Sequence, residues 1–204
     1  MNNENLKSCT AFSGHQRVAS GNLMSVARKV KAIIDQDERA SVVIFDDEAS
    51  EIVEVDFRGS VEDVEKRLET QKKSGEAAST ASDTEQPLQR GPGRPRLGVV
   101  SREVTLLPRH WDWLNRQPGG ASVALRKLVE AARRVNRGKD KVRHSREVAY
   151  RFMSAMAGDF PGFEEATRAL FAGDSERFNR WIDSWPVDIR DHARKLAEAA
   201  FQKS

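Results

Sequence analysis

The stretch TAFSGHQRVASGNLMSVARKVKAII, residues 10–34, decides the fold class of this chain. Its first half predicts a short hairpin that turns near Ser13, Gly14 and His15, because small and polar residues interrupt a strand-like run. In the second half Asn22 can cap a helix, since its side chain accepts from the free N–H groups of a first turn. A hairpin followed by an amphipathic helix indicates an α+β fold. The apolar positions of that helix have i, i+3, i+4 spacing: Leu23, Val26, Ala27, Val30, Ile33 and Ile34.

Two more strands are expected in residues 41–57, SVVIFDDEASEIVEVDF, with the turn in DDEAS. In the second of these, Val53, Val55 and Phe57 alternate with acidic residues, which is the period of a half-buried strand. A further helix should begin at Ser60, because Asp63 stands where a capping-box partner belongs. Residues 8–71 are therefore expected to form a small N-terminal α/β-hairpin domain.

Residues 72–89, KKSGEAASTASDTEQPLQ, have no hydrophobic period and predict a flexible linker. At the other end, residues 144–203 predict a helical part with core aromatic residues. Its expected helix boundaries are caps at Ser145, Asp174 and Asp188, and stops at Gly158, Gly173 and Pro186.

The charges are unevenly distributed over the 204 residues, although the whole chain carries only +3. Residues 1–89 sum to −6, residues 90–151 to +11, and residues 152–204 to −2. A basic block of this kind is expected where a segment meets phosphate, although it is also compatible with a solvated, Arg-rich surface. A single cysteine, no signal peptide and no apolar run of membrane-spanning length predict a cytoplasmic protein that does not enter the membrane.

Residues 99–137 place a strand, a short helix, the break QPGG and a longer helix in that order. This order resembles the ribbon-helix-helix family of DNA-binding proteins. The resemblance implies a homodimer in which two strands form a ribbon in the major groove and the second helices interlock. The alternative is a helix-turn-helix-like fragment packed within its own monomer.

Within this segment the strand period puts Arg102, Val104 and Leu106 on one face and Ser101, Glu103 and Thr105 on the other. The second set would read bases, because Thr can bond a base edge and Glu can accept from cytosine. Pro108 suits the first turn of the short helix. The second helix is expected from Ser122 to about Asn136, with the Ser122 end, Arg126 and Lys127 on phosphate.

Residues 90–98, RGPGRPRLG, resemble the AT-hook, an extended peptide that lies in the minor groove of A·T-rich DNA. Proline keeps such a backbone extended and glycine permits close approach to the groove floor. Pro92 stands where the AT-hook has an arginine, which leaves Arg94 and Arg96 as the groove-binding pair. The arm is therefore expected to select A·T-rich double-stranded DNA.

Nearly the whole chain is similar to a bacterial family catalogued as domain of unknown function 2239. The similarity is carried by TAFSGHQRVASG, VVIFDD, GPGRPRLGVVSREVTLLPRHWDWL, GGASVALRKLV, YRFMSAMAGDFPGFEEATRALFAGD and WPVDIRDHA. It implies a bacterial cytoplasmic protein and brings no activity or assigned site.

No catalytic signature is present, so we expect no enzyme and no cofactor. The four histidines have no metal-ligand spacing and are interpreted as surface or packing residues. The acids of the turn, Asp46, Asp47, Glu48 and Glu51, are interpreted as solvent-exposed rather than as a metal site.

Two functions from different classes remain. The first is a DNA-binding transcriptional regulator, nucleoid-associated, whose N-terminal domain serves as a sensor or partner module. The second is an adaptor whose basic block docks an acidic protein, with Trp111 and Trp113 as interface anchors. In either case the N-terminal or C-terminal region could bind a protein partner.

Overall fold

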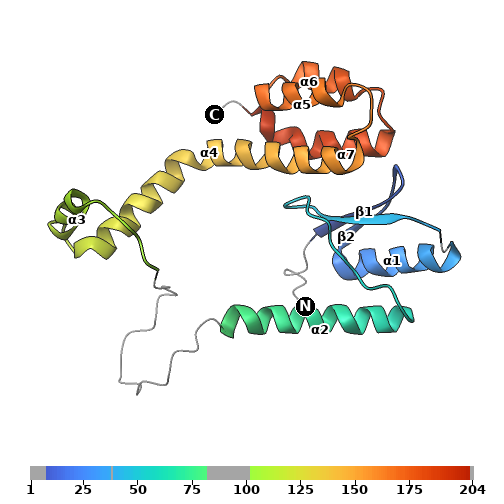
Figure 1. Ribbon diagram of the computed structural model, residues 1–204, viewed down its shortest axis with the longest axis horizontal. Helices are drawn as coiled ribbons and strands as arrows, with labels where there is room; N and C mark the ends of the chain where they lie inside the picture. The colour runs from blue at the N-terminus through green and yellow to red at the C-terminus, as the bar shows by residue number, and fades with distance from the viewer. Residues whose placement is uncertain (1–7, 38, 82–101, 203–204) are drawn as a thin grey trace. The chain divides into compact units, whose positions relative to one another are not determined.

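The computed structural model describes residues 8–37, 39–81 and 102–202 (Figure 1). The α+β class is confirmed: an antiparallel sheet of order β2-β1-β3 is followed by a largely helical chain. No helix in the described ranges is long and apolar enough to cross a membrane. The elements are β1 Ser8–Ser13, β2 Gln16–Asn22, α1 Leu23–Gln36, β3 Val42–Asp46, α2 Val61–Ala81, α3 Pro108–Asn115, α4 Gly120–Met156, α5 Phe163–Ala172, α6 Ser175–Ile182, α7 Val187–Ala197 and the 3-10 helix η1 Glu198–Phe201.

The chain divides into two compact units, here called the core unit and the basic unit. The core unit combines Met1–Ala78 with Gly138–Ser204, and the basic unit is Ser79–Arg137. The segments 8–71 and 144–203, which the sequence analysis separates, therefore share one unit. The reason is that their apolar residues form a common core.

Both faces of the sheet are buried, and the strand period decides which residue lies on which face. In β1, Cys9 and Ala11 belong to the cluster that includes Val26 and Val30 of α1. Their neighbour Phe12 belongs to the cluster formed by the helices from α4 onward. β3 repeats the pattern, with Ile44 in the α1 cluster and Phe45 in the helical one. The sheet is thus the layer between α1 and the C-terminal helices.

The hairpin and the α1 cap are confirmed. Ser13 pairs with Gln16 across a turn at Gly14 and His15. The Asn22 Oδ1 atom accepts from the Ser25 N–H at 2.8 Å, so the cap that ends β2 also begins α1.

The second strand expected within residues 41–57 is wrong, although its burial pattern is right. After the turn at 47–49 the chain makes one isolated bridge, Phe45 to Ile52, and a Val53 N–H bond to the Ile44 carbonyl at 2.8 Å. Val53, Val55 and Phe57 still pack half-buried on the α1 cluster. An extended chain keeps the side-chain period of two without ladder pairing, and this explains why the pattern predicts burial but not the strand.

Helix α2 begins with the expected capping box. The Ser60 N–H donates to Asp63 Oδ2 at 3.0 Å, and the Asp63 N–H donates to Ser60 Oγ at 3.3 Å. The helix continues to Ala81, ten residues into the range 72–89 that was expected to be a linker. Alanine, glutamate, glutamine and lysine in 71–81 favour a helix once it has begun, and lack of a hydrophobic period does not stop it. The remainder of that range, 82–89, lies outside the described residues.

Helix α4 replaces two helices that the sequence predicts. It runs unbroken from Gly120 to Met156, so the expected end near Asn136 and the cap at Ser145 are both wrong. Ser145 lies inside the helix and is buried, and its hydroxyl donates to the Leu196 carbonyl of α7 at 2.6 Å. The local sequence predicts a cap at this serine, whereas a partly buried acceptor on another helix determines its role.

The later helix boundaries are mostly confirmed. Gly173 ends α5 in the left-handed region at φ 76°, and Asp174 caps α6 by accepting from the Arg177 N–H at 3.0 Å. Asp188 is not a cap, because α7 already begins at Val187 after Pro186. Its carboxylate accepts instead from the backbone N–H of Arg17 on the edge strand β2, at 2.9 Å.

Candidate nucleic-acid interface

After the end of α2, the next described residues of the basic unit are 102–107, which form no strand. Residues 102–107 therefore do not form the expected strand, since the described residues offer this segment no neighbouring strand with which to share backbone hydrogen bonds. The segment ends at Leu107, whose extended backbone (ψ 150°) caps α3, and Pro108 takes the first helical position as expected. Leu114 is the buried residue of α3, at 3% exposed.

The turn between α3 and α4 depends on glycine. Gly119 and Gly120 have φ of +85° and +74°, where side chains are disfavoured. A Cβ atom on Gly119 would also lie 3.1 Å from Val123 Cβ. The Gly120 N–H donates to the Gln117 carbonyl at 2.9 Å and closes the turn. Helix α4 begins at Gly120, two residues before Ser122. The predicted cap at Ser122 is therefore wrong, and that residue is exposed in the first turn.

The part of α4 in the basic unit has two opposite faces. At 100° per residue, Arg126, Arg133 and Arg137 fall on one face, and all three are exposed. The opposite face is apolar, and it is largely uncovered: Leu128 is 48% exposed and Val135 is 78% exposed. Other basic residues flank the first face, and one acid, Glu130, pairs with Arg133 at 2.9 Å.

The structure describes some of the residues that are predicted to read bases or to bind phosphate, and others lie outside the described residues. Glu103 and Thr105 are exposed in the non-regular segment. Ser122 and Arg126 lie one turn apart on α4, and Lys127 follows at the side of the same surface, all exposed. Three of the predicted residues lie outside the described residues: Arg94, Arg96 and Ser101.

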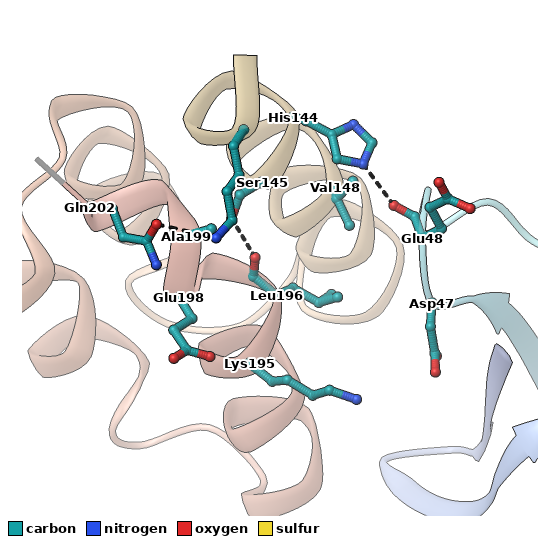
Figure 2. A pocket seen from close by; sticks show the side chains of 11 residues that line it. Asp47, Glu48, His144, Ser145, Val148, Lys195, Leu196, Glu198, Ala199 and Gln202 are labelled. Carbon is teal, nitrogen blue, oxygen red and sulfur yellow. Dashed lines mark hydrogen bonds between the residues drawn. The ribbon is translucent and has the colours of Figure 1, made fainter. Parts of the chain in front are cut away.

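The core unit contains a pocket of about 380 Å³ that the sequence analysis missed (Figure 2). It is lined by α4, by the end of α7 with η1, and by the turn after β3. His144 of α4 meets the Glu48 carbonyl of that turn at 3.0 Å, and Lys141 donates to Gln202 Oε1 at 3.3 Å. Acidic and basic side chains line it together, which gives it no dominant charge. Its lining comes from three segments, residues 47–48, 141–148 and 195–202, which lie far apart in the sequence, so no local spacing could reveal it.

The acidic turn is held by its own carboxylates. Asp46 Oδ1 accepts from the N–H groups of Glu48 and Ala49 at 2.7 and 3.1 Å. Asp47 accepts from the hydroxyls of Ser8 and Thr10 at 2.7 and 2.6 Å. No group of acids, histidines and cysteine within 8–37, 39–81 and 102–202 is arranged to hold a metal ion. These carboxylates therefore have a structural use in fixing the turn.

His192 of α7 is a packing residue, as expected for a histidine of this sequence. It is 2% exposed and packs edge-on against Phe152 and Phe12, with ring centroids 4.6 and 5.3 Å away. Neither ring nitrogen has a hydrogen-bond partner within the described chain. Burial lowers the pKa of His192 to about 4, against a weaker opposing effect of Asp47.

The fold is that of an α+β protein, with both faces of a small sheet covered by helices and a separate basic unit. A family model described as "Uncharacterized protein conserved in bacteria (DUF2239)" matches residues 8–197. The chain belongs to this bacterial family. Neither the curated proteins nor the solved structures compared with it gave a match.

Proposed function

We propose that this protein binds double-stranded DNA as a homodimer and acts as a transcriptional regulator. The observation that carries the proposal is the pair of opposite faces on the first half of α4. One face is basic and exposed through Arg126, Arg133 and Arg137, and the other is apolar and uncovered. A solvated basic surface explains the first face but not the second, because exposed leucine and valine side chains favour burial.

The basic face supports contact with the phosphate backbone. The three arginines repeat at i, i+7 and i+11 along one side of a rigid helix, and Lys127 and Arg134 flank them. Such contacts position a protein on DNA without reading its sequence. Base preference would come from Arg94 and Arg96 in the minor groove and from the segment with Glu103 and Thr105.

The apolar face supports self-association. Leu128 and Val135 are 48% and 78% exposed, and they share one side of the helix with Ala132. Val129, 53% exposed, lies three residues after Arg126 and four before Arg133, at the edge of the arginine face. A second copy of the same helix offers a complementary apolar surface and leaves both basic faces outward, as a symmetric DNA-binding dimer requires.

A second candidate function has its own support. Trp113 is 51% exposed and Trp111 is 37% exposed on α3. Tryptophan anchors of this kind dominate many protein interfaces, so an adaptor that docks an acidic protein would use α3 rather than the arginine face of α4.

The test is fluorescence anisotropy with A·T-rich and G·C-rich duplexes across a salt series, together with the mass of the protein in solution. The triple variant Arg126→Ala, Arg133→Ala, Arg137→Ala should lower the slope of log affinity against log salt by about 2.7, since each lost phosphate contact removes about 0.9. A matched control removes three exposed arginines of the core unit, Arg168, Arg177 and Arg180, and should leave the slope unchanged.

Two further variants separate the functions. Replacing Arg94 and Arg96 by alanine should abolish the A·T preference, and Val135→Asp should convert a dimer to a monomer. Absence of duplex binding at low salt would contradict the DNA-binding proposal. Capture of an acidic partner that depends on Trp111 and Trp113 would then favour the adaptor.

A further inference from the structure

Cationic and aromatic side chains share one face of α4 within the core unit. Lys139, Arg143, Arg146 and Tyr150 repeat at i, i+4, i+7 and i+11, which puts them in a single row on the helix. Phe171 of α5 adjoins the end of the row, with its ring centroid 5.7 Å from that of Tyr150. This row is separate from the arginine face of the basic unit.

A hollow of about 470 Å³ lies along this row. That volume is in the range of small-molecule sites. Its lining carries three cations and one carboxylate, so its charge favours an anion. The lining residues are Lys139, Val142, Arg143, Arg146, Glu147, Phe171 and Gln202.

Arg146 is held in place by uncharged groups. One terminal nitrogen of its guanidinium approaches the Ala200 carbonyl at 3.5 Å, and the Nε atom is buried with no hydrogen-bond partner in the described chain. A Cβ atom on Gly173 would lie 2.9 Å from the same terminal nitrogen, so glycine there leaves room for it. A guanidinium positioned in this way keeps its charge and donors for an anion.

The neighbouring cations differ in their partners. Arg143 pairs with Asp140 at 2.9 Å and is therefore partly neutralised. Lys139 makes no ion pair in the part of the chain that the structure describes, and Glu147 is the one carboxylate of the lining. Lys139 lies about one turn before Arg143 on α4 and Arg146 about one turn after it. These two residues provide the positive charge that no ion pair within the described residues offsets.

The aromatic pair provides a different kind of contact. Phe171 is 47% exposed and Tyr150 is 41% exposed, and their rings meet edge to face at 62°. Large aromatic side chains beside a basic surface offer their faces to planar rings, and bases stack on such side chains in nucleic-acid complexes.

From these observations we propose that this face of α4 binds a nucleoside phosphate, with the phosphate on Lys139 and Arg146 and the base against Phe171 and Tyr150. The inference does not rest on duplex binding by the basic unit. The nucleotide could be free or part of a single strand, since both present the same phosphate and base.

The test measures fluorescence anisotropy of a methylanthraniloyl derivative of ADP on the full chain. Unlabelled ADP should displace the probe at least about ten-fold better than inorganic phosphate or adenosine alone, because only ADP makes both contacts. A short single-stranded oligonucleotide is tested as a second competitor. If it displaces the probe better than ADP does, per nucleotide, the ligand is part of a single strand. If ADP displaces the probe better, the ligand is a free nucleotide.

Variants locate the site. Arg146→Ala and Lys139→Ala should each weaken probe binding about ten-fold, and Lys139 is an exposed residue. Phe171→Ala should weaken the binding of ADP but not that of inorganic phosphate. The Arg180→Ala control and the Arg126, Arg133, Arg137 triple variant should bind like the unmodified chain, which separates this site from the proposed DNA surface. Unsaturable binding, or full binding by Lys139→Ala and Phe171→Ala, would overturn the proposal.

Discussion

His192 should make the core unit less stable as the pH falls from 7 to 5. Its pKa is about 4 in the folded chain, whereas an unfolded histidine titrates near 6.5. The unfolded chain therefore binds the proton first, and stability is highest above pH 6.5 and declines until the pH passes below 4. The difference of about 2.5 pKa units limits the total loss to roughly 3 kcal/mol, of which about 2 kcal/mol occurs by pH 5.

Urea unfolding followed by circular dichroism at pH 7, 6 and 5 would measure this loss. The His192→Phe variant keeps an aromatic ring beside Phe12 and Phe152 and should lose about 2 kcal/mol less than the unmodified chain over that range. The exposed His144→Gln variant is the control and should keep the full dependence. Equal pH dependence in His192→Phe and the unmodified chain would refute the assignment to the buried ring.

Three other stability predictions follow from single contacts. Ser145→Ala removes the donor to the partly buried Leu196 carbonyl and should cost about 1–3 kcal/mol in urea unfolding, whereas a surface role for Ser145 would cost almost nothing. Gly119→Ala introduces a side chain at positive φ beside Val123, and about 1–2 kcal/mol of helix-turn stability should be lost, seen as faster proteolysis within α3. Phe12→Ala should lower the unfolding free energy by about 3–5 kcal/mol, and a loss below 1 kcal/mol would contradict its place in the shared core.

Local signals predict the parts of this fold that local contacts determine. Asn22, Ser60, Asp174 and Gly173 each act within about four residues of their own position, and the structure confirms all four. The helix-turn-helix order of α3 and α4 is predictable for the same reason, because Pro108 fixes the backbone at the start of α3 and the two glycines permit the positive φ angles of the turn.

Contacts between distant segments explain what the sequence analysis missed. Phe12 and Phe152 meet with ring centroids 5.4 Å apart, yet no periodic pattern connects residues so far apart in the chain. The same limit applies to Ser145, whose local sequence resembles a cap and whose real partner is Leu196. The two pockets described above escaped prediction because their linings combine residues from separate parts of the sequence.

The two-sided burial of β1 and β3 has a consequence for biosynthesis. Phe12 and Phe45 leave the ribosome early, but the helix that carries His192, which packs against Phe12, is translated about 150 residues after Phe45. At 5–20 residues per second, this side of the sheet remains uncovered for roughly 7 to 30 seconds. The nascent chain therefore exposes an aromatic sheet surface during most of its synthesis, and a chaperone that shields it would act on the growing chain rather than on the released protein.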